Sequence, residues 1–552
     1  MAVALTRRSV EKGFQRLHEP LAVTSSLALR RNGGSSATLA AQADRGELKS
    51  GKDLPGTTTW KTLYRMLFKG YRNRLHELQI YEKKLYGPLY RAAVGNYNTV
   101  NLNTVELLEE LLRKDEKYPC RGDMSLWTDY RDMRGVGYGP FTEEGEKWYH
   151  LRAILNKRML YPKDSVKYEP VINEVVSDFI KTLFHLRQAS PTGDMVQNLS
   201  NELYRFSLEG ISSILFETRI GCLEREIPPE TQHFIDSIAK MFFYSSIVSV
   251  LPKWTQNYLP FWKKYISGWD GIFDFAEKLI DKKIEDIQSR LNQGETVEGE
   301  YLTYLLSSTK LTNRDVYGSI TELLLAGVDT TSNTMMWALY RLSHEQEAQD
   351  TLYREVAGVV PEGSIPTAQD ITHMPYLRAV IKETLRMYPV VPFNARVMLE
   401  QDVVVGGHYF PKNTTFVMCH YAIGQDESVF PEPWKFKPER WLRDGRARPN
   451  PFGSIPFGFG VRGCAGRRIA ELEMHLALAR IIRLFEIRPD TRMGEVKAFH
   501  RTVLVADRQN PREKMELPSQ VSHRKHTLDL WMLTTGHANI LYTVTILRCQ
   551  LT

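Results

Sequence analysis

The 552-residue sequence is 25% charged and 42% hydrophobic, which is typical of a globular protein with a sizeable core. Its five cysteines, at positions 120, 222, 419, 464 and 549, are far apart and form no Cys-x-x-Cys pair, which disfavours a disulfide framework and a zinc cluster. The formal net charge is +7, and no run of about 20 apolar residues is present, so we expect no membrane-spanning helix.

The first 45 residues have a distinct composition. Within residues 1–40, six basic residues stand against only Glu11 and Glu19, and Ser and Ala are frequent. An Arg-rich, Ser-rich and acid-poor segment is typical of a mitochondrial transit peptide, the alternative being a disordered tail with chance charges. We predict a transit peptide and disordered lead over residues 1–45.

The remainder of the chain has mostly helical patterning. Apolar residues recur at intervals of three and four in residues 103–114, 169–187 and 470–487. Strand-like pieces are few, and VVVGGHYFP (403–411) and TTFVMCHY (414–421) are examples. The predicted fold is therefore mainly α with small β-sheets.

Residues 145–152, GEKWYHLR, place Trp148 and Arg152 four apart on a helix. Both side chains donate hydrogen bonds, so together they suit a carboxylate or propionate. An exposed Arg packed on Trp is the alternative.

A long helix is predicted from Thr312, which can form a capping pair with Asp315, to about His344. Its centre, ITELLLAGVDTTSNTMMWAL, is apolar on most faces, yet it contains Gly327, Asp329 and Thr330. Buried polar groups and a mid-helix glycine both cost free energy, which indicates a working site. A helix kink with a satisfied Thr cluster remains the alternative.

Glu383 and Arg386 lie three apart in YLRAVIKETLRMYPVVP, a spacing that an ordinary ion pair also has. Arg440, in FPEPWKFKPERWL, is a candidate third member of a buried triad in which one carboxylate accepts from two guanidinium groups. Arg396 lies in an extended stretch that follows Arg386 in the sequence.

The segment PFGFGVRGCAGRR (456–468) places Cys464 among glycines and arginines. Glycines allow close approach of something large and flat, and cations favour a thiolate. A nucleophilic cysteine needs a His partner, and none is near in sequence. A thiolate ligand to haem iron therefore fits better than a nucleophile, although a buried thiol without function is also an option.

These motifs, in this order over roughly residues 55–507, resemble the cytochrome P-450 superfamily. FGFGVRGCAG resembles its haem loop, AGVDTT its oxygen-activating helix, and ETLR with PERW its structural triad. The resemblance implies a haem-thiolate monooxygenase with haem b (iron protoporphyrin IX) as cofactor. By the same resemblance the haem domain spans residues 46–507.

The resemblance also implies roles for single residues. Cys464 matches the axial thiolate ligand, and Thr330 matches the residue that hydrogen-bonds dioxygen, with Asp329 supplying protons and Gly327 leaving room for dioxygen. Groups that hold the haem propionates are matched by Trp148, Arg152, Arg396 and Arg462, and the structural triad by Glu383, Arg386 and Arg440.

Two features resemble the mitochondrial branch of the superfamily, namely the transit-like segment and a basic surface. Arg378 and Lys382 match positions that dock an acidic ferredoxin, and Arg467 and Arg468 extend that patch, although a solvated helix face is the alternative. The implied partners are a mitochondrial ferredoxin and its NADPH-dependent reductase, and no nucleic-acid partner is expected.

Longer stretches, such as GVDTTSNTMMWALYRLS and KETLRMYPVVPFNARV, resemble sterol side-chain hydroxylases of this branch. The implied substrates are cholesterol and bile-acid intermediates, with vitamin D hydroxylation as the alternative. The predicted substrate pocket includes Val391, Phe393, Asn394, Leu325 and Ala326.

The aromatic-rich residues 241–269 are expected either to rest on the inner mitochondrial membrane, on the matrix side as a peripheral contact, or to form a lid over the substrate. After about Asp507 the chain matches the family no longer. Residues 508–552 are therefore an atypical carboxy-terminal tail, which leaves a catalytically impaired sterol-binding haem protein as another hypothesis.

Overall fold

The computed structural model describes residues 48–94, 97–196, 198–297, 299, 301–443, 449–489, 496–506 and 519–523. The predicted transit peptide, and the tail apart from residues 519–523, lie outside the described residues. The helices are α3 (Thr59–Phe68), α4 (Leu75–Tyr86), α5 (Val105–Leu112), α6 (Ser125–Arg134), α7 (Gly145–Met159), α8 (Pro162–Ser165), α9 (Glu169–Ala189), α10 (Leu199–Leu215), α11 (Pro229–Val248), α12 (Pro260–Asn292), α13 (Leu302–Leu306), α14 (Asn313–His344), α15 (Gln346–Val359), α16 (Ala368–Thr372), α17 (Pro375–Met387), α18 (His420–Gly424) and α19 (Arg467–Leu484).

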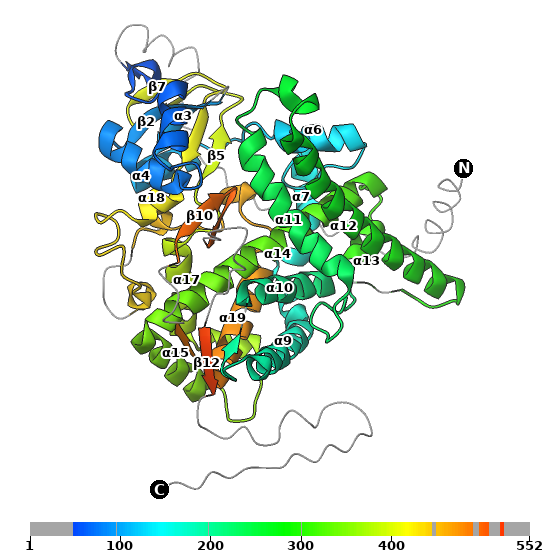
Figure 1. Ribbon diagram of the computed structural model, residues 1–552. Coiled ribbons are helices and arrows are strands. Elements are labelled where there is room, and N and C mark those ends of the chain that lie inside the picture. Colours follow the sequence, from blue (N-terminus) through cyan, green and yellow to red (C-terminus); the bar gives the residue numbers. More distant parts are fainter. Residues whose placement is uncertain are drawn as a thin grey trace, which may run out of the picture.

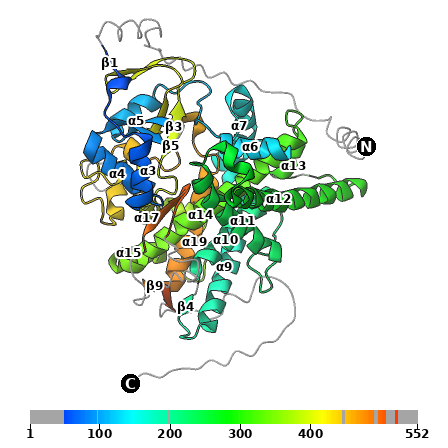
Figure 2. The same ribbon diagram turned by 45° about the horizontal axis from the view of Figure 1, so that its top comes forward.

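The predicted long helix is α14, which lies in the middle of the molecule with α10, α17 and α19 around it (Figures 1 and 2). Thr312 and Asp315 form the expected capping box, since each side chain accepts from the backbone N–H of the other residue. The 32 residues of α14 span about 48 Å at 1.5 Å per residue. This helix is buried along most of its length, as its apolar sequence predicts.

The other patterned segments also form helices. Residues 103–114 contain α5, and residues 169–187 lie in α9. The predicted helix over residues 470–487 was too long, because α19 ends at Leu484 and Phe485 begins the strand β9 (Phe485–Pro489). Phe485 is fully buried there and contacts Phe184 of α9, so its apolar side chain serves the core from a strand.

The strands form small sheets. The largest has the order β2-β3-β8-β5, and a second has the order β1-β7-β6. In the second sheet, the predicted strand-like piece VVVGGHYFP forms two strands, β6 and β7, which Gly406 and Gly407 join as a hairpin with positive φ angles of 56° and 71°. The bounds are β1 (Lys49–Ser50), β2 (Leu89–Val94), β3 (Tyr97–Leu102), β5 (Asn394–Val397), β6 (Val403–Val405), β7 (His408–Phe410) and β8 (Thr415–Met418).

The atypical tail contributes one strand. The segment β12 (Ser519–His523) pairs antiparallel with both β9 and β4 (Met195–Val196). The hairpin before it consists of β10 (Ala498–Arg501) and β11 (Val503–Ala506), and its tip residue Thr502 has a φ of 69°. Part of the tail that matches no family pattern therefore completes a sheet of the folded body.

The apolar core has two parts. The larger part is built from the helices around α14. The smaller part lies between α5 and the strands of the sheets β2-β3-β8-β5 and β1-β7-β6. Figures 1 and 2 both place α3, α4, α5 and their strands on one side of the molecule and the larger helical body on the other. Among the described residues, no helix is long and apolar enough to cross a membrane.

Candidate haem and oxygen-activation site

Cys464 lies in a tight loop between the 3₁₀ helix η6 (Gly460–Arg462) and the start of α19. Its backbone N–H donates to Phe457 O at 2.8 Å. Gly458 and Gly460 have φ angles of 73° and 66°, a left-handed conformation that glycine adopts at little cost. The loop therefore holds the thiol in a fixed place at the amino-terminal end of a helix, where the helix dipole favours a thiolate.

The Cys464 thiol is exposed although its loop lies deep in the fold. Burial raises the pKa of this thiol, whereas the N–H of Gly466 and the charges of Arg152 and Arg121 act in the opposite direction. A coordinated metal ion removes the thiol proton outright. An exposed side chain surrounded by protein lines an internal space, which suits a ligand to a bound group better than a core thiol.

Four arginines gather beside this space. Arg121 is strongly desolvated and close to Arg462, Arg396 and Arg152, and this burial and repulsion lower its pKa to about 9. Burial likewise lowers the pKa of Arg462 to about 10, although Glu144 opposes the shift. The sequence analysis did not find Arg121, because only the fold brings it to the cluster.

The cluster has a surplus of positive charge. Arg462 pairs with Glu144 at 2.5 Å, and Arg396 pairs with Asp115 at 3.1 Å. Among the described residues, no carboxylate pairs with Arg121 or with the predicted propionate contact Arg152. Four guanidinium groups against two paired carboxylates leave two positive charges, which equals the charge of the two haem propionates.

Trp148 supplies a further donor. It is buried, and its ring lies 3.6 Å from the Arg462 guanidinium carbon. Among the residues that the structure describes, its Nε1–H has no partner, and neither does Nε of Arg152, whose Nη2 donates to the carbonyl of Gly463 next to Cys464. Buried hydrogen-bond donors without partners cost free energy, so an anionic ligand that accepts hydrogen bonds from these donors is favourable at this place. The donor set therefore fits haem.

The centre of α14 presents different side chains to different surroundings. Thr330 and Ala326 are partly exposed within an otherwise buried helix, and Thr330 Oγ1 donates to Ala326 O at 2.7 Å. Asp329 is buried, and its Oδ1 accepts from Tyr204 of α10 at 2.6 Å. The two adjacent candidates thus make hydrogen bonds on different sides of the helix.

Gly327 lies where α14 contacts α10. A Cβ at this position would lie 2.7 Å from Cγ1 of Ile211, a residue of α10. The missing side chain thus allows α10 to pack closely on α14, while the role in leaving room for dioxygen stays a prediction.

The structure brings the three predicted triad residues together. Glu383 is fully buried and accepts from Arg386 Nε at 2.9 Å and from Arg440 Nε at 3.2 Å. Trp441 Nε1 also donates to Glu383, at 2.9 Å, which the sequence analysis missed. Arg386 further donates to the carbonyl oxygen of Gly424 at 2.6 Å, so the cluster ties α17 to the segment before the Cys464 loop.

The four predicted docking residues are all exposed, two on α17 and two at the start of α19. Burial and the charges of Arg378 and Arg467 lower the pKa of Lys382, so residues from both helices act on one lysine. Arg467 donates to Glu471 at 3.0 Å, which partly neutralises it. Arg468 is exposed beside it.

The predicted substrate residues have mixed exposure. Leu325 is buried in the larger core, whereas Ala326 is partly open. Val391 is exposed, and Phe393 is half-buried with its ring 5.0 Å from that of His500. Asn394, which begins β5, is half-buried, and its Oδ1 has no partner within the described part of the chain.

Comparison with known proteins defines the class. Residues 54–513 match the cytochrome P450 family model, and the chain therefore belongs to this family. It is thus a monooxygenase that uses haem.

Particular relatives are also similar. The chain is 49% identical over 470 residues to sterol 26-hydroxylase, mitochondrial, of Mus musculus, an alignment covering 84% of this chain and 88% of that protein. The protein of the same description from Homo sapiens is 48% identical over 468 residues, 83% of this chain and 88% of that protein. The 25-hydroxyvitamin D-1 alpha hydroxylase, mitochondrial, of Homo sapiens is 40% identical over 464 residues, 83% of this chain and 91% of that protein.

Proposed function

We propose that this protein hydroxylates the side chain of sterols such as cholesterol and bile-acid intermediates. The observation that supports this proposal most strongly is the 49% identity to a mitochondrial sterol 26-hydroxylase over 84% of the chain. Vitamin D hydroxylation is the second candidate, because a mitochondrial 25-hydroxyvitamin D hydroxylase is 40% identical over 83% of the chain.

We assign the thiolate of Cys464 as the axial ligand of haem b. Arg152, Arg396, Arg462 and Trp148 hold the propionates, and the surplus charge of the cluster supports this role. When bound, haem supplies an iron centre that activates dioxygen with two electrons. Glu383, Arg386 and Arg440 form a structural triad. Its buried hydrogen bonds stabilise the segment of the chain that precedes the Cys464 loop.

Asp329 and Thr330 deliver protons during turnover. Thr330 donates its hydroxyl hydrogen to Ala326 O on the open side of α14, so the hydroxyl oxygen remains able to accept a hydrogen bond from a neighbouring donor. Asp329, a buried carboxylate on the adjacent side, is the acid that exchanges protons. The proposed substrate contacts remain Val391, Phe393, Asn394, Leu325 and Ala326. The apolar side chains of Val391 and Phe393 suit an apolar sterol.

The electrons come from a reduced ferredoxin, whose own reductase uses NADPH. Exposed Arg378, Lys382, Arg467 and Arg468 offer a basic surface to which an acidic partner is attracted. The small number of charges suits a transient complex, as electron transfer requires.

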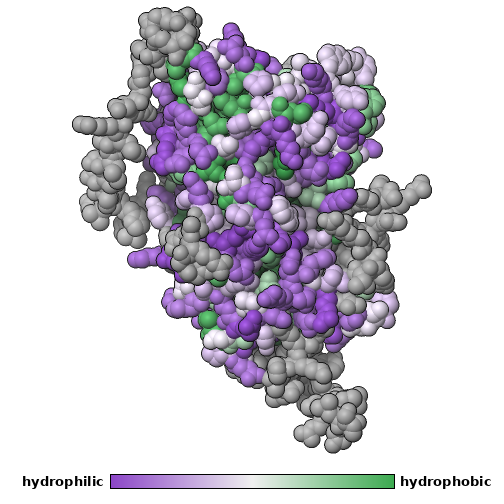
Figure 3. Space-filling view, turned by 90° about the vertical axis from the view of Figure 1, so that its left-hand side faces the viewer, coloured by the Kyte–Doolittle hydropathy of each residue, from purple (hydrophilic) through white to green (hydrophobic). Residues whose placement is uncertain are grey.

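We place the protein on the matrix side of the inner mitochondrial membrane as a peripheral protein, with residues 1–45 as the transit peptide, 46–507 as the haem domain and 508–552 as the tail. Trp60 and Phe68 on α3, together with Trp254 and Tyr258 in and after the 3₁₀ helix η3 (Lys253–Asn257), are large and exposed. Hydrophobic side chains also gather in the upper part of the face shown in Figure 3, where the amino-terminal elements lie. Such rings are favourable at a lipid interface.

Reconstitution with ferredoxin, ferredoxin reductase and a panel of sterols and vitamin D compounds tests the function, with products identified by mass spectrometry. A hydroxylated sterol side chain supports the proposal, and a hydroxylated vitamin D with no sterol product supports the second candidate. Sterol-induced changes of the haem spectrum without any product would instead indicate an impaired sterol-binding haem protein. Cys464→Ala is expected to abolish the thiolate spectrum, and a variant that keeps this spectrum contradicts the assigned ligand.

A further inference from the structure

A polar cluster lies between α10 and α14, on the side of Asp329 that the proposed function does not yet use. Tyr204 Oη donates to Asp329 Oδ1 at 2.6 Å, and Asn333 Nδ2 donates to Tyr204 Oη at 2.9 Å. Asn333 Nδ2 also donates to the backbone oxygen of Asp329, at 2.7 Å. Tyr204, Asp329 and Asn333 are all buried, so these bonds form away from bulk water.

The direction of each hydrogen bond follows from the atoms present. Only the amide nitrogen of Asn333 can bond to the Asp329 carbonyl oxygen, because two oxygens without hydrogen cannot pair. That nitrogen has a second hydrogen, which it gives to Tyr204 Oη. The single phenol hydrogen is therefore committed to Asp329 Oδ1, and a bond of 2.6 Å to a carboxylate is in the range of strong charge-assisted bonds.

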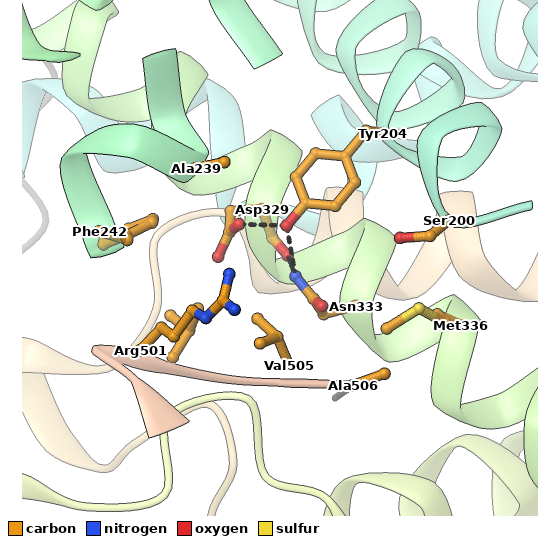
Figure 4. A pocket seen from close by; sticks show the side chains of 11 residues that line it. Ser200, Tyr204, Ala239, Phe242, Asp329, Asn333, Met336, Arg501, Val505 and Ala506 are labelled. Carbon is orange, nitrogen blue, oxygen red and sulfur yellow. Dashed lines mark hydrogen bonds between the residues drawn. The ribbon is translucent and has the colours of Figure 1, made fainter. Parts of the chain in front are cut away.

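A small cavity of about 30 Å³ adjoins this chain of hydrogen bonds. Such a volume has room for one or two water molecules, provided that polar groups surround them. Ser200, Tyr204, Asp329, Asn333 and Arg501 supply these groups. Figure 4 shows the Arg501 guanidinium, which comes from the hairpin tip, turned toward the Asp329 carboxylate.

We propose that Tyr204 is a positioning residue that orients the Asp329 carboxylate toward this water-holding cavity, from which Asp329 takes up protons. Asn333 fixes the hydroxyl of Tyr204, and Tyr204 in turn fixes the side-chain rotamer of Asp329. This inference rests on the proposed proton delivery by Asp329. It adds α10 and the carboxy-terminal hairpin to the parts of the fold on which turnover depends.

Tyr204→Phe tests the inference because it keeps the buried ring and removes only the hydroxyl. In the reconstituted holoenzyme we expect an unchanged KM for cholesterol and about a tenfold lower kcat, the effect of losing one hydrogen bond to a charged acceptor. A smaller share of the NADPH electrons should be recovered in product. A crystal structure of the variant should show the Asp329 side chain in another rotamer.

The control is Tyr130→Phe, which removes a hydroxyl that donates to a different carboxylate, Asp270 of α12, at 3.0 Å. It should leave kcat unchanged. If Tyr204→Phe does not fold, Asn333→Ala tests the same chain from its other end and should lower kcat with an unchanged KM.

The result that overturns the inference is a Tyr204→Phe enzyme with the kcat, electron recovery and Asp329 rotamer of the wild type. Asp329→Asn separates this failure from a failure of the proposed function. If Asp329→Asn is impaired while Tyr204→Phe is not, only the positioning role is wrong. If both variants keep full activity, proton delivery by Asp329 is wrong as well.

Discussion

Glu322 and Arg131 form a fully buried ion pair whose removal is expected to be severe. Arg131 Nη2 donates to Glu322 Oε1 at 2.7 Å, and neither side chain is exposed. The same carboxylate accepts from Thr142 Oγ1 at 2.6 Å and from the Phe141 N–H at 2.7 Å. The Arg131 guanidinium also lies against the ring of Trp269, with 4.6 Å to its centroid.

Glu322→Ala leaves the buried guanidinium of Arg131 with no carboxylate. Removing one partner of a buried ion pair costs about 3–5 kcal/mol of unfolding free energy. Thr142 and the Phe141 N–H lose their acceptor in the same step, which places the expected value at the upper end of this range. The affected segment leads from α6 into α7, so we also expect faster loss of haem, because α7 bears Trp148 and Arg152.

The measurement is urea unfolding of the haem-loaded protein, followed by far-ultraviolet circular dichroism, for Glu322→Ala, Arg131→Met and a double variant Arg131→Met/Glu322→Leu. Because the double variant buries no unpaired charge, it should be more stable than Glu322→Ala. Arg134→Met is the matched control on α6, since its pair with Asp270 is half-exposed and is worth about 1 kcal/mol or less. A double variant that loses the sum of the two single effects would refute the reasoning.

Three further changes test other parts of the structure. Burial raises the pKa of Glu473 well above its ordinary 4.5. The folded state therefore binds a proton more tightly than the unfolded state, and the protein loses stability as the pH rises above about 4.5. Glu473→Gln should flatten this decline in unfolding measurements between pH 5 and 8, and an unchanged slope would contradict the prediction. Trp441→Phe should cost about 1.5–3 kcal/mol in urea unfolding, because Glu383 loses a donor, and no loss means that this bond contributes nothing. Lys382→Glu should raise the KM for ferredoxin at low salt and much less at high salt, and a salt-independent effect argues against electrostatic docking.

The sequence predicted those features that depend on local chemistry. The capping box at the start of α14 needs only Thr312 and Asp315, three residues apart, and it is present. The Glu383–Arg386 contact follows from helical spacing in the same way. The sequence offered Arg440 only as a candidate partner of Glu383, because 57 residues separate the two and helical spacing cannot relate them.

Features that depend on packing between distant segments gave no usable signal. Arg121 belongs to the arginine cluster because the loop before α6 folds against the Cys464 loop, and a single arginine in a sequence does not reveal its neighbours. Gly327 shows the same limit. Its position in a conspicuous motif favoured a functional interpretation, and only the fold reveals that the missing side chain also allows close packing against Ile211.

The pair Asp329 and Thr330 shows why adjacent residues of one motif need separate accounts. Successive residues of an α-helix point about 100° apart, so neighbours in sequence address different surroundings. Thr330 is on the open side of α14, and Asp329 meets Tyr204 of α10. A protonatable group on the packed side can be held in one orientation by buried hydrogen bonds, while the hydroxyl on the open side stays accessible to the reacting molecules. If Asp329 is the proposed acid, its orientation is set by a hydrogen bond from α10, a helix outside every motif that pointed to the site.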